Sequence, residues 1–269
     1  MRLLIFLVLF TLLSGCTSGL EQNNLQGYGQ SISDENNIYS KEISKNIANE
    51  KNSDKKIEAN PDKKYQEVKV KNKKILDVPL IKQNPELKYG CEITSLTMVL
   101  QYAGFKVDKM QLAKEMPKDY DRLVKSNSGN ILKWGDPNDG FVGDVTGKNA
   151  GYAIYDKPLE KIMRKFLAGR TINLTGKPFD QLLKQVENGK PVIVWTTGDY
   201  RLPDRWESWQ HGNEQIKTPL DLHAVVLVGY DDNNIYINDP LSGKKTYKVN
   251  KNIFIQSWRA LKMRALSYR

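Results

Sequence analysis

The feature of this sequence that most constrains its fold is a largely apolar stretch that begins at Cys91 and ends near Gly104. Within it, Met98 and Val99 extend an apolar face whose members recur at spacings of three and four, namely Ile93, Leu96, Leu100 and Ala103. That spacing is typical of a helix, and a helix that is apolar nearly all round is buried. Gly104 supplies the usual C-terminal stop. The stretch therefore predicts a central, buried helix with Cys91 at its N-terminus.

The position of Cys91 has chemical consequences. The N-terminus of a helix presents unpaired backbone N–H groups and about half a positive charge, and both favour a thiolate over a thiol. Because the thiolate is the nucleophilic form of cysteine, such a site predicts a lowered pKa and a reactive side chain. The alternative is that Cys91 is a small buried hydrophobe at the start of a core helix.

Composition narrows the classes of function. The formal net charge is +10, but the basic residues are interleaved with acidic ones and form no stripe with aromatic spacing, so we expect no nucleic-acid partner. Two histidines, one thiol in the folded part and no H-E-x-x-H motif predict no metal site. The acidic run at residues 136–140 is one residue short of a calcium loop and is interpreted as a turn. No cofactor is expected.

The N-terminus indicates export. A basic residue and an apolar run over residues 3–13, too short to span a bilayer stably, predict a signal peptide over residues 1–15. Leu13-Ser14-Gly15-Cys16 resembles the lipobox of bacterial lipoproteins, which implies acylation of Cys16 and an anchor on the extracytoplasmic face of the cell membrane. Residues 16–70 are polar and poor in large apolar side chains, which predicts a disordered tether. Residues 71–269 form the predicted folded domain.

Within that domain helices come early and strands late. Helices are expected over residues 91–103, 109–115, 158–167, 177–187 and 250–261, with Asp108 and Asp156 as N-caps. Strands are expected over residues 171–174, 191–197, 222–230, 235–239, 243–249 and 264–268. Two long stretches, residues 118–152 and 199–218, are interpreted as loops. The pattern predicts an α+β fold built on an antiparallel sheet.

A lone cysteine with a histidine and an acidic or amide residue far along the chain is the pattern of nucleophilic cysteine catalysis. Here the order is Cys91, His223 and Asp239. Cys91 would attack a carbonyl, and His223 would take the thiol proton and return it to the leaving group. Asp239 would orient the imidazole. The alternative for His223 is a structural histidine of the core, and His211 is expected near the surface.

The third member depends on the hairpin that joins residues 222–230 to 235–239. With an even loop, Asp239 pairs near Val226, on the opposite face from His223, and Asn238 is the better partner. With an odd, bulged loop, Asp239 pairs with Val225 and shares the face of His223. We favour Asp239 and keep Asn238 as the alternative.

Several of these segments together resemble the papain-like cysteine peptidases that process bacteriocin leaders, and more closely their stand-alone relatives. They are Gln83, Gly90-Cys91-Glu92-Ile93-Thr94-Ser95-Leu96, Gly143-Asp144, Gly189-Lys190-Pro191-Val192, His223-Ala224-Val225 and Asn238-Asp239-Pro240. The resemblance implies a papain-like fold with the catalytic cysteine on a central helix. It also implies that the Gln83 amide donates to the oxyanion, with the backbone N–H of Cys91 as second donor. Gly90 stands where exporter peptidases usually have Asp.

The sequence therefore predicts a lipid-anchored, monomeric cysteine peptidase-like hydrolase that acts on a peptide or protein substrate. A peptidoglycan endopeptidase or transpeptidase on the same scaffold is one alternative, and a catalytically silent cell-surface binding module is another. Three tryptophans in the long loops, Trp134, Trp206 and Trp209, are candidates for the walls of a substrate groove.

Overall fold

The structure is a computed structural model that describes residues 73–269. The predicted signal peptide over residues 1–15, the lipidation site Cys16 and the tether over residues 16–70 lie outside the described residues. None of the helices in the described part has the length and apolar character needed to cross a membrane.

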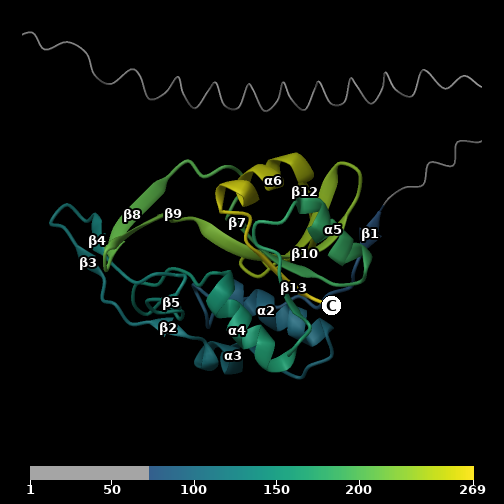
Figure 1. Cartoon of the computed structure of the whole chain (residues 1–269), viewed down its shortest axis with the longest axis horizontal. Coiled ribbons are helices and arrows are strands. Elements are labelled where there is room, and N and C mark those ends of the chain that lie inside the picture. The colour runs from purple at the N-terminus through teal and green to yellow at the C-terminus, as the bar shows by residue number, and fades with distance from the viewer. Residues whose placement is uncertain (1–72) are drawn as a thin grey trace, which may run out of the picture. The chain divides into compact units, whose positions relative to one another are not determined.

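A twisted antiparallel sheet forms the centre of the domain (Figure 1). Its strands run in the order β12-β11-β10-β7-β13-β6, and β1 pairs with β10. Their bounds are β1 (Lys74–Ile75), β6 (Thr171–Asn173), β7 (Val192–Thr197), β10 (Leu222–Tyr230), β11 (Asn234–Asp239), β12 (Lys244–Asn250) and β13 (Ala265–Tyr268). Every residue of β7 is buried, as are seven of the nine residues of β10. An apolar run of this kind is what a strand covered on both faces requires.

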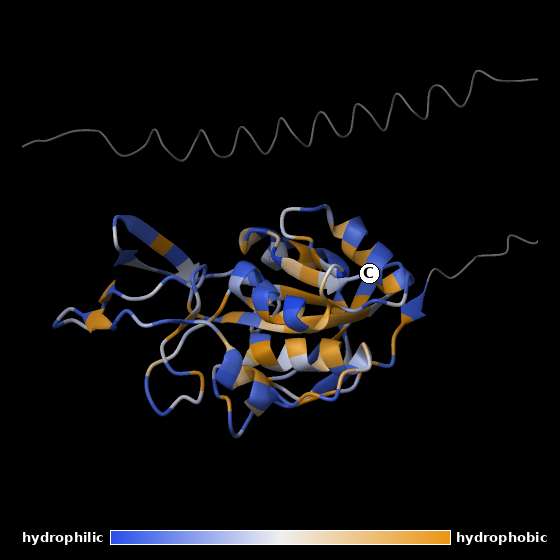
Figure 2. Ribbon diagram, turned by 60° about the horizontal axis from the view of Figure 1, so that its bottom comes forward, coloured by the Kyte–Doolittle hydropathy of each residue, from blue (hydrophilic) through white to orange (hydrophobic). Residues whose placement is uncertain are grey.

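Helices cover both faces of this sheet. α2 (Cys91–Tyr102), α3 (Lys109–Glu115) and α4 (Asp156–Phe166) lie on one side, whereas α5 (Phe179–Glu187) and α6 (Lys251–Ala260) lie on the other (Figure 1). α2 is buried from Cys91 to Leu100, as its apolar pattern predicts. Figure 2 shows the same arrangement by hydropathy, with apolar residues concentrated on the central strands and on the helices packed against them. The predicted α+β class is confirmed.

The segment predicted as a loop over residues 199–218 contains a β-hairpin, which corrects that prediction. β8 (Trp206–His211) and β9 (Glu214–Pro219) pair around Gly212 and Asn213, and Gly212 has a positive φ of 54°. β3 (Val124–Lys125) and β4 (Ile131–Lys133) join this hairpin in a four-stranded sheet. The other predicted loop also contributes β2 (Lys118–Asp119) and β5 (Phe141–Val142), which pair with each other.

Two of the three tryptophans predicted to line a substrate groove are instead part of a second hydrophobic cluster. Trp134 is 5% exposed and Trp209 is 2% exposed, and their ring centroids lie 5.7 Å apart. The cluster is completed by Val142, Tyr152, Ala153 and Ile216. The indole N–H of Trp209 donates to the Gly135 carbonyl at 2.9 Å, so its polar atom is also occupied. Burial on this scale corrects the prediction that Trp134 and Trp209 form walls of a substrate groove.

One predicted helix cap is correct and one is wrong. The Asp108 carboxylate accepts hydrogen bonds from the backbone N–H groups of Met110 and Gln111, as an N-cap does. In α4 the N-cap is Tyr155, and Asp156 lies in the first turn. The Asp156 carboxylate instead forms an ion pair with Arg264, at 3.5 Å.

Candidate active site

Cys91 is the first residue of α2, and Gly90 is the N-cap. A Cβ at Gly90 would lie 2.5 Å from the Cβ of Leu87, so only glycine allows the chain to turn this closely into the helix. The backbone N–H of Tyr89 donates to the Val145 carbonyl at 3.0 Å. The turn that delivers Cys91 is therefore packed on one side by its own preceding loop and on the other by the segment that follows β5.

His223 and Asp239 are in direct contact. His223 Nε2 lies 2.7 Å from Asp239 Oδ1, and the two residues are 3% and 2% exposed. This contact leaves Nδ1 of the imidazole free for another partner. Asp239 also accepts hydrogen bonds from the hydroxyls of Tyr200 at 2.7 Å and Ser242 at 2.6 Å. Burial opposes ionisation of Asp239, but the hydrogen bond and charge of His223 outweigh it with help from these hydroxyls, so that the pKa of Asp239 is lowered.

A β-bulge decides which residue of β11 meets His223. Val226 pairs with Asn238 and Leu227 with Ile237, but the register then shifts so that Gly229 pairs with Tyr236. The extra residue in β10 gives the odd count that puts Asp239 on the face of His223. Asn238 is used elsewhere, since its side-chain amide donates to the Val78 carbonyl at 2.9 Å.

The first turn of α2 lies against the start of β10. The Ser95 hydroxyl donates to the Ala224 carbonyl at 3.2 Å, and the backbone of Ala224 lies close enough to the sulfur of Cys91 to act toward a lower pKa of the thiol. Because Ala224 follows His223 directly in the chain, these contacts bring the Cys91 thiol to the part of β10 that carries the imidazole. The cysteine and histidine that are 132 positions apart in the sequence thus reach one region.

The surroundings of Cys91 nevertheless favour the thiol over the thiolate and raise its pKa, which corrects the prediction of a lowered pKa. Burial raises the pKa of the thiol well above its ordinary value, and the charge of the neighbouring Glu92 raises it further. Cys91 Sγ donates a hydrogen bond to Glu92 Oε2 at 3.2 Å. The backbone N–H of Glu92 at the helix terminus acts in the predicted direction, but it is outweighed.

Gln83 is buried next to the loop that follows Asp239. Its backbone N–H donates to the Pro240 carbonyl at 2.9 Å, and its side-chain Nε2 donates to the Lys88 carbonyl at 2.7 Å. Lys109 fixes the same segment from outside by donating to the Gln83 carbonyl at 3.0 Å. Gln83 is therefore held between the loop that leads to Cys91 and the loop that follows Asp239.

Three residues of this region, Glu92, Tyr200 and Ser242, were not among those expected at the site, and only Glu92 carries a signal in the sequence. Glu92 is an acidic residue inside a helix predicted to be buried, and carboxylates are rarely buried unless they are paired with another group. Tyr200 and Ser242 contact Asp239 from two separate loops, and nothing in their local sequence points to that role. Tyr200 has a positive φ of 66°, a conformation that bulky residues rarely adopt.

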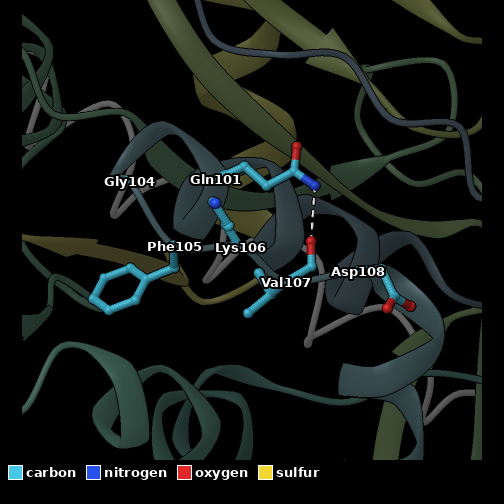
Figure 3. Close-up of a pocket in the computed structure, with 6 residues that line it drawn as sticks. All are labelled: Gln101, Gly104, Phe105, Lys106, Val107 and Asp108. Carbon is cyan, nitrogen blue, oxygen red and sulfur yellow. Dashed lines mark hydrogen bonds between the residues drawn. The ribbon is translucent and has the colours of Figure 1, made fainter.

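Of the three tryptophans predicted to line a substrate groove, only Trp206 is exposed, at 44%. It borders a small hollow together with Tyr155, Lys217, Thr218, Pro219, Leu222, Ala260, Leu261, Lys262 and Arg264. Leu222 directly precedes His223 in β10, but successive side chains of a strand point to opposite faces, so this hollow is not assigned to the site. A second hollow, shown in Figure 3, lies around Gln101, Gly104, Phe105, Lys106, Val107 and Asp108. It is at the other end of α2, about 15 Å along the helix axis from Cys91.

His211 lies in an acidic cluster on the edge of the domain. Its Nε2 is 3.1 Å from Asp119 Oδ2 and 3.6 Å from Asp121 Oδ2, and Asp136 and Asp139 also approach it. The carboxylates already organise the loop, since Asp119 accepts the backbone N–H groups of Asp121 and Asp136. We assign no metal to this cluster.

Comparison with known proteins places this geometry in a family. A model of the Peptidase_C39 like family matches residues 75–266, which include all of the residues described above as a site. The chain belongs to this family. The match begins at β1 and ends within β13, so the C39-like region coincides with the domain that the structure describes.

Two relatives support the assignment. The uncharacterized protein YvpB of Bacillus subtilis is 36% identical over 198 residues, which cover 72% of this chain and 75% of YvpB. A crystal structure from Bacillus anthracis, solved as a candidate C39-like peptidase, superposes with a TM-score of 0.67 at 41% identity. That match covers 73% of this chain and 97% of the Bacillus anthracis chain. The predicted relationship to the stand-alone relatives of the peptidases that process bacteriocin leaders is confirmed, and the family indicates a peptidase-like function.

Proposed function

We propose that the chain is a cysteine peptidase-like hydrolase that cleaves peptide bonds through Cys91, His223 and Asp239. The observation that carries this proposal is the buried contact of 2.7 Å between His223 Nε2 and Asp239 Oδ1, one residue away from the strand backbone that meets the Cys91 sulfur. A buried carboxylate that fixes one ring nitrogen and leaves the other free is the arrangement that a general base needs.

The proposed reaction has two steps. The proton of the Cys91 thiol moves to Nδ1 of His223, and the thiolate sulfur attacks the substrate carbonyl carbon, so that a C–S bond forms and the oxygen becomes an oxyanion. When the C–N bond breaks, the departing amine takes the proton from His223. A water molecule then gives a proton to His223 and attacks the thioester, which releases the carboxylic acid and returns the proton to the sulfur. Asp239 orients the imidazole and stabilises its charged form throughout.

The proposed setting is the outer surface of the cell membrane. A lipid on Cys16 and a tether of more than fifty residues would hold the domain on the extracytoplasmic side, where a peptide or protein segment would be the substrate. The support is the lipobox-like sequence at residues 13–16. We propose that the chain needs no cofactor, because the chemistry above uses only its own side chains and water. We also propose that it acts as a monomer, because all three of these side chains come from one chain.

The proposal is tested by digesting a library of peptides with the full chain carrying Cys16→Ser, in which Cys91 is the only thiol. We expect new peptide N-termini, detected by mass spectrometry, that disappear after complete alkylation of Cys91. Purified peptidoglycan is digested in parallel, and release of wall peptides from it alone identifies a wall endopeptidase. No cleavage in either sample by the folded, unalkylated chain would favour a catalytically silent module and contradict the proposal.

Gln83→Ala is expected to lower kcat for a cleaved peptide about 100-fold with little change in KM. The reason is that the amide of Gln83 would donate to the oxyanion, which exists only after attack on the carbonyl, and not to the ground-state substrate. Steady-state kinetics on the cleaved peptide measure both constants. Gln181→Ala, at an exposed position of α5, is the matched control and should keep the activity of the parent. An unchanged kcat in Gln83→Ala would remove Gln83 from the site.

A further inference from the structure

Glu92 is a buried carboxylate beside the proposed nucleophile. Its side chain is 0% exposed, Oε2 accepts the hydrogen bond from Cys91 Sγ at 3.2 Å, and Oε1 accepts from the backbone N–H of Ile154 at 3.1 Å. Among residues 73–269, no Lys, Arg or His side chain forms an ion pair with it. Because charged side chains are almost never fully buried without a partner, the position of Glu92 calls for an explanation.

The groups that face Glu92 leave its charge uncompensated. From α2 it meets the Cys91 thiol and its own backbone N–H, and from the segment before α4 it meets the Ile154 N–H. The Tyr152 hydroxyl is near enough to feel the charge of Glu92, but it is hydrogen-bonded to Thr218 and Pro219. β10 brings the Ala224 backbone to the sulfur, with His223 as the adjacent titratable residue. Burial raises the pKa of Glu92 to about 7, so its charge changes near neutral pH. A thiolate at Cys91 would place a second negative charge about one hydrogen-bond length from the first, inside a medium of low dielectric constant.

We propose that Glu92 is a positioning residue that holds Cys91 as a thiol in the resting enzyme and releases the thiolate when its own negative charge is lost. In the resting state the carboxylate accepts the thiol proton in a hydrogen bond. When Glu92 takes up a proton from solvent, the proton on Cys91 Sγ moves to His223 Nδ1, and the buried pair again carries a single negative charge. The inference deepens the proposed function, because it names the group that regulates the proposed nucleophile.

A purely structural role for Glu92 makes a different prediction. If Glu92 only held the Ile154 N–H, Glu92→Gln would behave like the parent, since glutamine keeps the Oε1 acceptor and the shape of the side chain. The charge is what glutamine removes. The measured quantity is therefore the ionisation of Cys91, reported by its rate of alkylation, because only the thiolate reacts.

The experiment measures alkylation of Cys91 by iodoacetamide between pH 5.5 and pH 9 in the full chain carrying Cys16→Ser. We expect Glu92→Gln to react about three- to tenfold faster than the parent at pH 8, because a lower pKa gives more thiolate while the sulfur becomes somewhat less nucleophilic. The two rates should converge toward pH 5.5, where Glu92 of the parent is neutral. Asp180→Asn makes the same change of charge at an exposed position in the first turn of α5, and should match the parent.

Rates for Glu92→Gln that equal or fall below those of the parent at pH 8 would overturn the proposal. If this variant does not fold, the pH dependence of the alkylation rate of the parent tests the proposal on its own. Its log rate should flatten near pH 7, where ionisation of Glu92 offsets the rise in pH, and a uniform tenfold rise per pH unit would overturn the proposal. Alkylation needs no substrate, so the result stands whether or not the chain cleaves the peptide library.

Discussion

Cys91→Ala is expected to lower the rate of peptide cleavage by about 10,000-fold or more, to the level left by binding alone. Alanine fills nearly the same volume at the start of α2, where Cys91 is 6% exposed, but it has no atom that can form the thioester. The loss should therefore appear in kcat while the fold is retained. Steady-state kinetics with a cleaved peptide, together with thermal unfolding of the same samples, provide the measurement.

His223→Ala should cause a loss of similar size, and the double variant should be no worse than either single one. Residues that act as one unit show this failure of additivity, because removing either partner already disables the proton transfer. Cys16→Ala is the matched control for the chemistry of the substitution, and in detergent-free assays it should cleave as the parent does. Independent, multiplying losses in the double variant would show that Cys91 and His223 do not work together.

The central part of this site could be predicted from the sequence because its signals are local. The apolar stretch after Cys91 predicts a buried helix, and the continuous run that becomes β10 predicts a strand covered on both faces. Both elements form as expected. Composition also limits which residue could be the general base for Cys91, since His223 and His211 are the only histidines in the chain.

The choice between Asp239 and Asn238 could not be made in the same way. It depends on the register shift between Leu227 and Gly229, and a single extra residue in one strand moves every later side chain to the other face. Gly229 lies at this shift, and an isolated glycine in a strand can mark a bulge, but it does not fix which residue of the strand is the extra one. The sequence therefore supplies both candidates, and only the paired strands distinguish them.

The β8–β9 hairpin could not be predicted from the sequence for a different reason. Gly212-Asn213 is a two-residue turn signal, but the flanking stretches mix Trp, Glu and Gln and lack the regular alternation of a half-buried strand. Trp209 is buried by residues from β5 and the segment after it, far along the chain. Its burial depends on tertiary contacts, so a tryptophan that could be exposed on local sequence grounds is instead part of a hydrophobic core.

The second large effect that we expect is a pH dependence of the free energy of unfolding that comes from Glu92. Its pKa is about 7 in the folded chain, because of burial, against an ordinary value of 4.5. A carboxyl group whose pKa is raised by folding favours the folded state below its unfolded pKa, and this contribution is lost as the pH rises toward the folded pKa. Between pH 4.5 and pH 7.5, the parent should therefore lose about 3 kcal/mol of stability relative to Glu92→Gln.

Urea unfolding of both proteins at the two pH values measures this difference directly, since every other titrating group is common to the pair and largely cancels. Asp180→Asn should follow the parent at both pH values, because that carboxylate is exposed in both states. A difference between parent and Glu92→Gln that stays constant with pH would mean that Glu92 keeps its ordinary pKa inside the fold. In that case the carboxylate beside Cys91 would be charged throughout the physiological range, and its protonation could not release the thiol.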